Sequence, residues 1–403
     1  MFSRIFNSMC LLVSFPNIFK FAIFFFLYMK IAMFTDTYHP QFNGVVTSID
    51  FFVNELRKEH EVHIFCPHTP GFENKDKFVH MFKSIEFKRY PGYRIGLPAS
   101  LINFDFSDFD IIHLQTPATM GLAGLAIGKN NKIPIVGTFH TLIPEYSDYI
   151  TKAKIAKEVT KKVLWKFVKH FYNSCDAVIA PSNPIKKDLE KHGVIKKIYV
   201  IPTGIYLDKT AKEVIKKSKT YLRKKYKIPK NEKIILHVGR ITKEKNIELI
   251  LKAISKIDDV KLIITSEGPY KTHLEKMVKE LKIEKKVVFT GFLSRKKLYE
   301  YYRLSDAFVI ASKTETQGLV LLEATMFKLP ILSLDAPVVG DFVRENNAGI
   351  VCKEREFPES IKKVLKIRID NKKILEKYSP KMIIKDLIDV YNSVIESYKK
   401  EKN

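Results

Sequence analysis

Short runs rich in Val, Ile and Phe alternate with segments of helical period along most of this chain, and few folds accommodate that pattern. It is typical of βαβ units, whose strands lie parallel in a sheet with helices on both faces. The alternation pauses near Pro202-Thr203-Gly204 and then starts again. Strands are expected at residues 30–35, 61–66, 110–114, 133–138, 176–180 and 197–201, and then at 233–238, 260–265, 287–290, 306–311 and 330–334. The sequence therefore predicts an α/β fold with two doubly wound parallel-sheet domains.

The chain length of 403 residues also agrees with two domains. We expect the first domain at residues 29–203 and the second at 204–375. An amphipathic helix within 376–403 is expected to cross back to the first domain. Two such domains in tandem enclose a cleft between the carboxyl ends of their sheets, where α/β sheets bind ligands.

Residues 1–28 form an apolar, Phe-rich extension whose only charges are Arg4 and Lys20. A signal peptide and a short membrane anchor are two interpretations of such a segment. Lys20 divides it, however, and the uncharged pieces are shorter than the ~20 residues that span a bilayer. The strand expected from Lys30 also leaves no linker between a membrane helix and the sheet. We therefore expect the functional chain to begin at Met29.

The chain is strongly basic, with 69 Lys and Arg against 44 Asp and Glu and a net charge of +25. Such a field attracts nucleic acid, an anionic membrane surface or an acidic small molecule such as a nucleotide. A general bias towards lysine explains the charge equally well. The sequence has no basic recognition helix, RNA-binding aromatic motif or zinc finger, so nucleic acid is not an expected partner. The four cysteines lack the paired spacing of a zinc or redox site.

The most informative pattern is Ser-Lys-Thr-Glu-Thr-Gln-Gly-Leu-Val-Leu-Leu-Glu-Ala at residues 312–324. It follows an expected strand and opens a helix. Gly318 lets the backbone approach a ligand, and the helix start offers free N–H groups. Glu315 and Glu323 stand eight positions apart, and carboxylates so placed can accept hydrogen bonds from a hexose and from a ribose. A helix cap with a surface glutamate is the structural alternative.

A second pattern, Gly-Arg-Ile-Thr-Lys-Glu-Lys at residues 239–245, ends another buried strand and begins a helix. Gly239 permits the turn, while Arg240 and Lys245 place two cations beside a helix start. That combination suits a diphosphate. Solvated basic residues at the start of a helix would give the same pattern.

Together these residues resemble the retaining GT-B glycosyltransferases of family 4 (glycosyl transferases group 1), and the resemblance covers about residues 29–366. In that family the two glutamates contact the donor sugar and the nucleotide ribose, which implies these roles for Glu315 and Glu323. The arginine and lysine of the second pattern bind the donor diphosphate, here Arg240 and Lys245. Gly318 is implied at the donor as well.

Further segments carry the same resemblance. Ser-Glu-Gly-Pro at 266–269 is similar to the family's Gly-Asp-Gly-Pro loop, and Val-Val-Phe-Thr-Gly-Phe at 287–292 is similar to the segment whose backbone receives the nucleobase. Gly268 and Phe292 are therefore expected at the donor. In the first domain, Gly44 belongs to a loop that resembles the one approaching the donor phosphates, and His140 matches the active-site histidine. Lys328, in contrast, stands where the family usually has a helix-terminating glycine.

The resemblance implies transfer of a hexose from a nucleotide-diphosphate sugar to an acceptor hydroxyl, with retention and with no cofactor or obligatory metal. The leaving diphosphate then helps to deprotonate the acceptor, with His140, Glu315, Arg240 and Lys245 as the catalytic residues. The sequence has no Asp-x-Asp pattern at a suitable strand end that would indicate a metal site. A nucleotide-sugar 2-epimerase uses the same two domains and diphosphate site and is the alternative enzyme.

The motif wording is most similar to family members that glycosylate diacylglycerol or related membrane lipids, and a soluble or polysaccharide acceptor is the alternative. Residues 151–173 are predicted to form a basic amphipathic helix in which seven lysines accompany an apolar stripe. The stripe consists of Ile155, Val159, Val163, Phe167 and Phe171. Either the stripe packs on the sheet and the lysines are solvated, or the helix meets an anionic membrane. We expect a cytoplasmic enzyme with peripheral contact to the inner face of the cell membrane.

Overall fold

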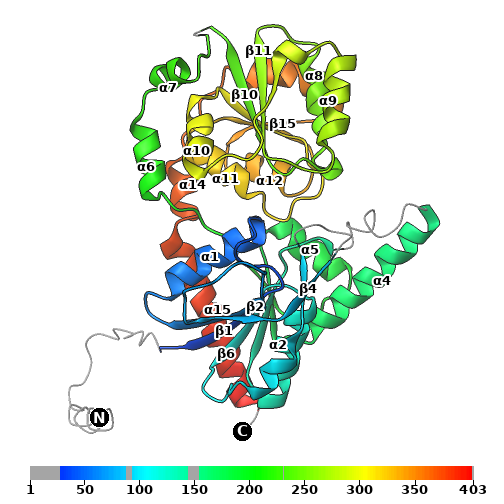
Figure 1. Cartoon of the computed structure of the whole chain (residues 1–403), viewed down its shortest axis with the longest axis vertical. Helices are drawn as coiled ribbons and strands as arrows, with labels where there is room; N and C mark the ends of the chain where they lie inside the picture. Colours follow the sequence, from blue (N-terminus) through cyan, green and yellow to red (C-terminus); the bar gives the residue numbers. More distant parts are fainter. Residues whose placement is uncertain (1–27, 88–92, 144–153, 230, 402–403) are drawn as a thin grey trace, which may run out of the picture.

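The structure is a computed structural model that describes residues 28–87, 93–143, 154–229 and 231–401. Two large parallel sheets follow one another along the long axis of the molecule, each covered by helices on both faces (Figure 1). Two apolar clusters fill the two faces of each sheet. The predicted pair of doubly wound α/β domains is therefore confirmed.

The first domain contains a seven-stranded parallel sheet with the strand order β3-β2-β1-β6-β7-β8-β9. Its strands are β1 (Lys30–Phe34), β2 (Glu61–Pro67), β3 (Val79–Phe82), β6 (Ile111–Leu114), β7 (Ile135–Thr138), β8 (Ala177–Ala180) and β9 (Ile198–Val200). Ile31 of β1 stands opposite Val62 on one side and Ile111 on the other. The order therefore reverses between β1 and β6, which opens a crevice at their carboxyl ends.

Helix α1 (Gly44–Leu56) shows how local sequence sets these elements. The side chain of Asn43 accepts hydrogen bonds from the N–H groups of Val45 and Val46 and so caps the first turn. The apolar stripe of this helix, Ile49, Phe52, Val53 and Leu56, is buried. The domain also contains helices α2 (Thr119–Asn131), α4 (Lys154–Asn173) and α5 (Asn183–Lys191) and a 3-10 turn at Pro98–Asn103.

The second domain repeats this plan with six parallel strands in the order β12-β11-β10-β13-β14-β15. The strands are β10 (Lys233–Val238), β11 (Val260–Thr265), β12 (Val287–Phe289), β13 (Ala307–Ile310), β14 (Ile331–Leu334) and β15 (Gly349–Cys352). Its helices are α6 (Lys209–Lys216), α7 (Lys219–Lys225), α8 (Ile247–Ile254), α9 (Lys271–Glu280), α10 (Arg295–Leu304), α11 (Leu319–Met326), α12 (Val339–Glu345), α13 (Phe357–Val364) and α14 (Lys372–Lys377). Here the order reverses between β10 and β13, so the loops after these two strands border one crevice.

The last helix, α15 (Pro380–Lys400), crosses back to the first sheet as predicted (Figure 1). Its buried Leu387 and Tyr391 join the apolar cluster of α1 and β1. The Tyr391 hydroxyl is hydrogen-bonded to Nδ1 of His113 on β6 over 2.6 Å. The two chain crossings between the domains are also joined, because the N–H of Ile205 donates to the carbonyl of Tyr378 over 2.9 Å.

Three peripheral elements were not predicted: β3, β15 and a hairpin of β4 (Ser84–Glu86) and β5 (Arg94–Gly96). β3 and β15 are edge strands of four residues, and only the last residue of each is buried. They therefore lack the continuous apolar run that marks a central parallel strand.

Lys328, just beyond α11, has a left-handed φ of 57°, the conformation in which glycine is favoured at a helix end.

Of the two alternatives for the helix at 151–173, packing of its apolar stripe on the sheet holds only in part. Phe171 is buried, but Val159 and Val163 on the same helix, α4, are 55% and 57% exposed. The first half of α4 extends away from the domain (Figure 1). In the part of the chain that the structure describes, no helix is long and apolar enough to cross a membrane.

The remaining expectation concerns the N-terminal extension, residues 1–28. Apart from Tyr28, it lies outside the described residues. A functional start at Met29 therefore stays a prediction.

Two buried histidines make the stability of the fold depend on pH. Burial lowers the pKa of His113 to about 3 and the pKa of His237 to about 4, because a charged imidazole loses its hydration. Both titrate near 6.5 in the unfolded chain. Below pH 6.5 the unfolded chain therefore binds protons that the folded chain does not bind. The free energy of unfolding should fall by up to about 1.4 kcal/mol per pH unit for each histidine.

We expect urea unfolding, followed by circular dichroism at pH 7, 6 and 5, to show this decline. A His113→Gln variant should show a smaller slope with pH than the wild type, because one of the contributing histidines is gone. A free energy of unfolding that is the same at pH 7 and pH 5 would contradict the inference.

Candidate active site

Lys245 and Glu315 form the centre of the candidate site, although 70 positions separate them in the chain. Lys245 lies in the loop after β10 and Glu315 in the loop after β13, the two strands at which the order of the second sheet reverses. The Lys245 ammonium donates to Oε1 of Glu315 over 2.6 Å, and the side chains are only 23% and 13% exposed. The residues predicted to bind the diphosphate and the sugar are thus in direct contact.

The ionisation of Glu315 depends on this contact. Loss of hydration raises the pKa of the Glu315 carboxyl, but the charge of Lys245 and hydrogen bonds from Lys245 and Ser312 outweigh it, so the pKa is lowered overall. The group is therefore a carboxylate at neutral pH. A carboxylate only accepts hydrogen bonds, which suits it to the hydroxyls of a sugar.

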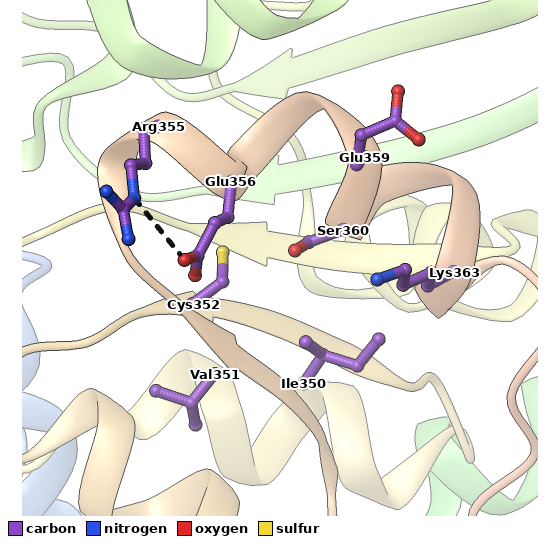
Figure 2. A pocket seen from close by; sticks show the side chains of 8 residues that line it. All are labelled: Ile350, Val351, Cys352, Arg355, Glu356, Glu359, Ser360 and Lys363. Carbon is purple, nitrogen blue, oxygen red and sulfur yellow. Dashed lines mark ion pairs between the residues drawn. The ribbon is translucent and has the colours of Figure 1, made fainter.

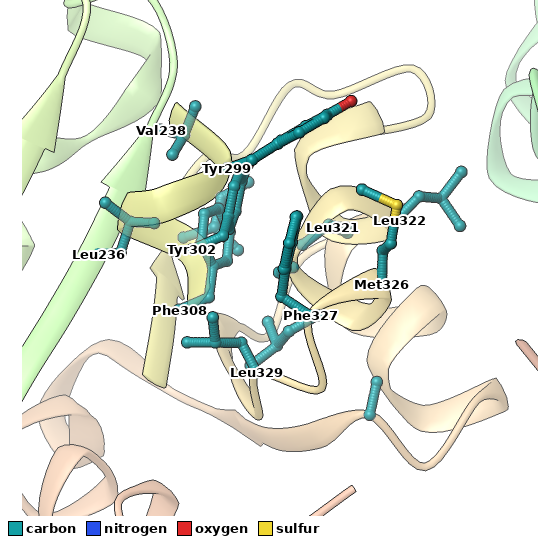
Figure 3. Close-up of a cluster of buried hydrophobic side chains, with 14 of the residues drawn as sticks. Leu236, Val238, Tyr299, Tyr302, Phe308, Leu321, Leu322, Met326, Phe327 and Leu329 are labelled. Carbon is teal, nitrogen blue, oxygen red and sulfur yellow. The ribbon is translucent and has the colours of Figure 1, made fainter. Parts of the chain in front are cut away.

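Glu323 on α11 is in a more apolar environment. Its Oε2 accepts a hydrogen bond from the Tyr302 hydroxyl over 2.8 Å. Loss of hydration raises the pKa of Glu323 in spite of this bond and of the charge of Arg295. Tyr302 stacks on Phe308 and Phe327 within the buried cluster below the site (Figure 3). The packing of this cluster therefore fixes the hydroxyl that orients Glu323.

Gly318 connects the two glutamates by starting α11 in the left-handed conformation, with a φ of 73°. The first N–H groups of a helix have no partner within it, which favours anions at that position. Arg240 follows Gly239 directly after β10, and its side chain is exposed. Gly318, after β13, and Arg240, after β10, therefore lie at the same crevice as Lys245.

His140 follows β7 of the first sheet, and its partner determines its tautomer. Nε2 donates to Oε1 of Gln115 over 2.7 Å, because an amide oxygen can only accept. Loss of hydration lowers the pKa of His140 to about 4, so the ring is neutral at pH 7 and Nδ1 carries a lone pair. The carbonyl of His140 accepts a hydrogen bond from the Thr316 hydroxyl over 3.0 Å, which brings it close to the loop of Glu315.

The loop after β1 is anchored at the switch point of the first sheet. The fully buried Asp36 carboxylate accepts hydrogen bonds from the hydroxyls of Thr116 and Thr119 over 2.6 and 3.0 Å. It also accepts from the N–H of Met120 at the start of α2 over 2.8 Å. This anchor holds the loop that leads to Gly44 close to the end of β6.

The predicted glycines at the site have different surroundings. A Cβ atom added to Gly44 would meet no atom within 4 Å, so there is open space beside the start of α1. A Cβ atom added to Gly268 would lie 2.1 Å from the carbonyl oxygen of Ile241. Because Gly268 has no side chain, its loop can pack directly against the backbone of Ile241, which follows Arg240. Phe292 follows β12 at the same end of the sheet, and its side chain is 74% exposed.

Gln115 and Tyr302, which orient His140 and Glu323, were missed at the sequence level. Gln115 directly follows the predicted strand at residues 110–114, and its place at the carboxyl end of a strand is a signal that could have found it. Tyr302 offered no such signal, because its position is typical of the core face of an amphipathic helix.

A separate hollow of about 460 Å³ lies between β15 and α13 and shares no residue with the site (Figure 2). It is lined by Ile350, Val351, Cys352, Arg355, Glu356, Glu359, Ser360 and Lys363. Within the described ranges, no three His, Cys, Asp or Glu side chains are grouped so that they could hold a metal ion. That no metal is required stays a prediction.

The two glycines should respond differently to a methyl group. In Gly268→Ala the Cβ atom meets backbone atoms of Ile241 that cannot move cheaply, so we expect the free energy of unfolding to fall by about 1–3 kcal/mol. Gly44→Ala should leave it unchanged or raise it by up to about 1 kcal/mol, because alanine favours a helix. Urea unfolding followed by circular dichroism measures both. Equal losses in the two variants would contradict the packing described for Gly268.

Comparisons with known proteins agree with this geometry. The family described as Glycosyl transferases group 1 matches residues 218–382, and Glycosyltransferase Family 4 matches residues 42–209. The alpha-monoglucosyldiacylglycerol synthase of Streptococcus pneumoniae is 34% identical over 339 residues, which cover 80% of this chain and 74% of that protein. The enzyme of the same name from Acholeplasma laidlawii is 30% identical over 361 residues, which cover 84% of this chain and 88% of that protein.

Solved structures show the same architecture. The crystal structure of Anabaena Alr3699/HepE in complex with UDP and glucose matches with a TM-score of 0.71 at 16% identity, over 91% of this chain and all of that one. At this identity the match supports the fold alone, which is the GT-B arrangement of two facing parallel-sheet domains. The family matches and the two sequence relatives show that this chain belongs to glycosyltransferase family 4.

Proposed function

We propose that this glycosyltransferase moves a hexose from a nucleotide-diphosphate sugar to a hydroxyl of a membrane lipid, with retention of the anomeric configuration. The observation that carries the proposal is the contact between Lys245 and Glu315 at the switch point of the second sheet, in a loop that also touches His140. Two relatives named as synthases of a monoglucosylated diacylglycerol support a lipid as the acceptor.

In this proposal the second domain holds the donor. Arg240 and Lys245 bind the diphosphate together with the N–H groups at the start of α11. Glu315 accepts hydrogen bonds from the hexose and Glu323 from the ribose. The segment ending at Phe292 receives the nucleobase.

The first domain contributes from the other side of the cleft. The open space at Gly44 admits the phosphates close to the start of α1. His140, neutral at pH 7, accepts a hydrogen bond from a sugar hydroxyl through Nδ1. Gly268 acts indirectly, by supporting the loop of Arg240.

The reaction proposed is a front-face displacement. The bond between the anomeric carbon and the diphosphate oxygen breaks, and the acceptor oxygen forms its bond on the same face. The acceptor proton passes to the departing phosphate oxygen. Negative charge grows on the diphosphate during this step, and fixed cations at that place lower the barrier. Arg240 and Lys245 are therefore the main electrostatic contributors.

Transfer from labelled nucleotide hexoses to diacylglycerol or its monoglucosylated form in vesicles tests this function. Arg240→Ala and Glu315→Ala should each lower turnover at least tenfold with unchanged circular dichroism, because each loses a contact with the donor. Arg355→Ala and Glu359→Ala, at the separate hollow, are matched controls that should keep full turnover. A folded Arg240→Ala or Glu315→Ala variant with wild-type turnover would refute the assigned roles. An epimerised nucleotide sugar as the product would identify the 2-epimerase instead.

We also propose that the exposed half of α4 binds an anionic membrane, which places the enzyme on the inner face of the cell membrane. Val159 and Val163 are more than half exposed, and Lys162 and Lys166 beside them are also exposed. Apolar side chains next to lysines are the composition of helices that lie in the interface of an anionic bilayer.

Sedimentation with vesicles tests this membrane contact. Lys162→Glu/Lys166→Glu should lower binding to phosphatidylglycerol vesicles at least tenfold, because each lysine near the surface contributes about 1 kcal/mol. Lys276→Glu/Lys279→Glu on α9 changes the net charge equally and should have a smaller effect. Equal losses in the two double variants, or equal binding of the wild type to neutral vesicles, would count against α4 as the contact.

A further inference from the structure

The side chain of Gln317 joins the loop of Glu315 to the first domain. Its Oε1 accepts a hydrogen bond from the N–H of Thr203 over 2.8 Å, and its Nε2 donates to the carbonyl of the same residue over 2.7 Å. Thr203 is only 4% exposed, and its hydroxyl is hydrogen-bonded to that of Ser48 on α1 over 2.7 Å. A continuous path of hydrogen bonds therefore runs from the helix that begins at Gly44 to the loop of the candidate site.

Thr316 adds two further contacts between the domains. Its hydroxyl donates to the carbonyl of His140 over 3.0 Å, and its own carbonyl accepts a hydrogen bond from the Ser182 hydroxyl over 2.8 Å. His140, Ser182 and Thr203 follow β7, β8 and β9, three neighbouring strands of the first sheet. Two consecutive residues thus connect with the carboxyl ends of three strands.

The position of these residues in the chain explains why the contacts matter. Thr316 and Gln317 stand between Glu315, which is bonded to Lys245, and Gly318, which starts α11. Because Glu315 directly precedes Thr316 and Gln317 in a short loop, a shift of these two residues would also shift Glu315. In transfer reactions a displacement of about 1 Å at a reacting group can cost a hundredfold in rate.

We propose that Thr316 and Gln317 are positioning residues, which set the placement of Glu315 relative to His140 when the two domains come together. This inference rests on the proposed function, since it assigns both residues to hexose transfer. Neither residue acts on the substrate in this scheme. They act through Glu315 and His140, whereas Arg240 and Lys245 lie on a different loop, after β10.

The test compares substitutions that remove these bonds with one that keeps a bond. Gln317→Leu removes both bonds to Thr203, and Thr316→Val removes the hydroxyl that reaches His140 but keeps the side-chain shape. Thr316→Ser retains the hydroxyl and is the matched control. The measurements are kcat for hexose transfer, Kd for the nucleoside diphosphate alone and the radius of gyration from X-ray scattering.

We expect Gln317→Leu and Thr316→Val to lower kcat at least tenfold, to leave Kd within twofold of the wild type and to increase the radius of gyration. Thr316→Ser should keep at least half of the wild-type kcat. A merely structural role would change Kd and kcat together.

Wild-type kcat in both Gln317→Leu and Thr316→Val would overturn the inference but not the proposed function, because the wild type would still transfer. An inactive wild type would instead count against the proposed function. The scattering measurement then decides the inference, and an unchanged radius of gyration in both variants overturns it.

Discussion

The reversal of strand order within each parallel sheet determines where this protein can bind a ligand. At β10 and β13 the connections leave in opposite directions, and the crevice between them receives the loops of Lys245 and Glu315. At β1 and β6 the same reversal positions Asp36 and Gln115. Because all strands of a sheet run in one direction, the loops that follow these strands lie at one end of each domain. The carboxyl ends of the two sheets face each other, so their loops border one site rather than two.

The electrostatics of the candidate site are balanced before any donor enters. The positive charge of Lys245 is matched by Glu315, and His140 is neutral because its environment disfavours the charged ring. A half-buried cation or carboxylate without its partner would be costly. In the proposed function, a diphosphate would therefore meet a Lys245 side chain already oriented by Glu315. Such preorganisation is what makes fixed charges effective during a reaction.

The parts of the structure that could be predicted from the sequence are those set by local pattern. The central strands are continuous apolar runs because both faces of the sheet are covered, and the residues that follow them are the polar residues of the crevice. The pairing of Gln317 with Thr203 could not be predicted, because it spans 114 positions and depends on how the domains meet. The exposure of Val159 could not be predicted from the hydrophobic pattern of the sequence either. An apolar stripe shows that a helix has two faces, but not what covers the apolar one.

The order of elements along the chain links the acceptor side of the proposed reaction to the proposed membrane contact. His140 follows β7, and α4 is the next helix of the described chain, so the candidate site histidine and the lysine-bearing helix belong to one connection between β7 and β8. The second half of α4 is packed on the sheet through Trp165, Val168 and Phe171. A bilayer held by the first half is therefore rigidly related to the end of β7. In these proposals the net charge of +25 would act at two separate places, on α4 at the membrane and at Arg240 and Lys245 on the diphosphate.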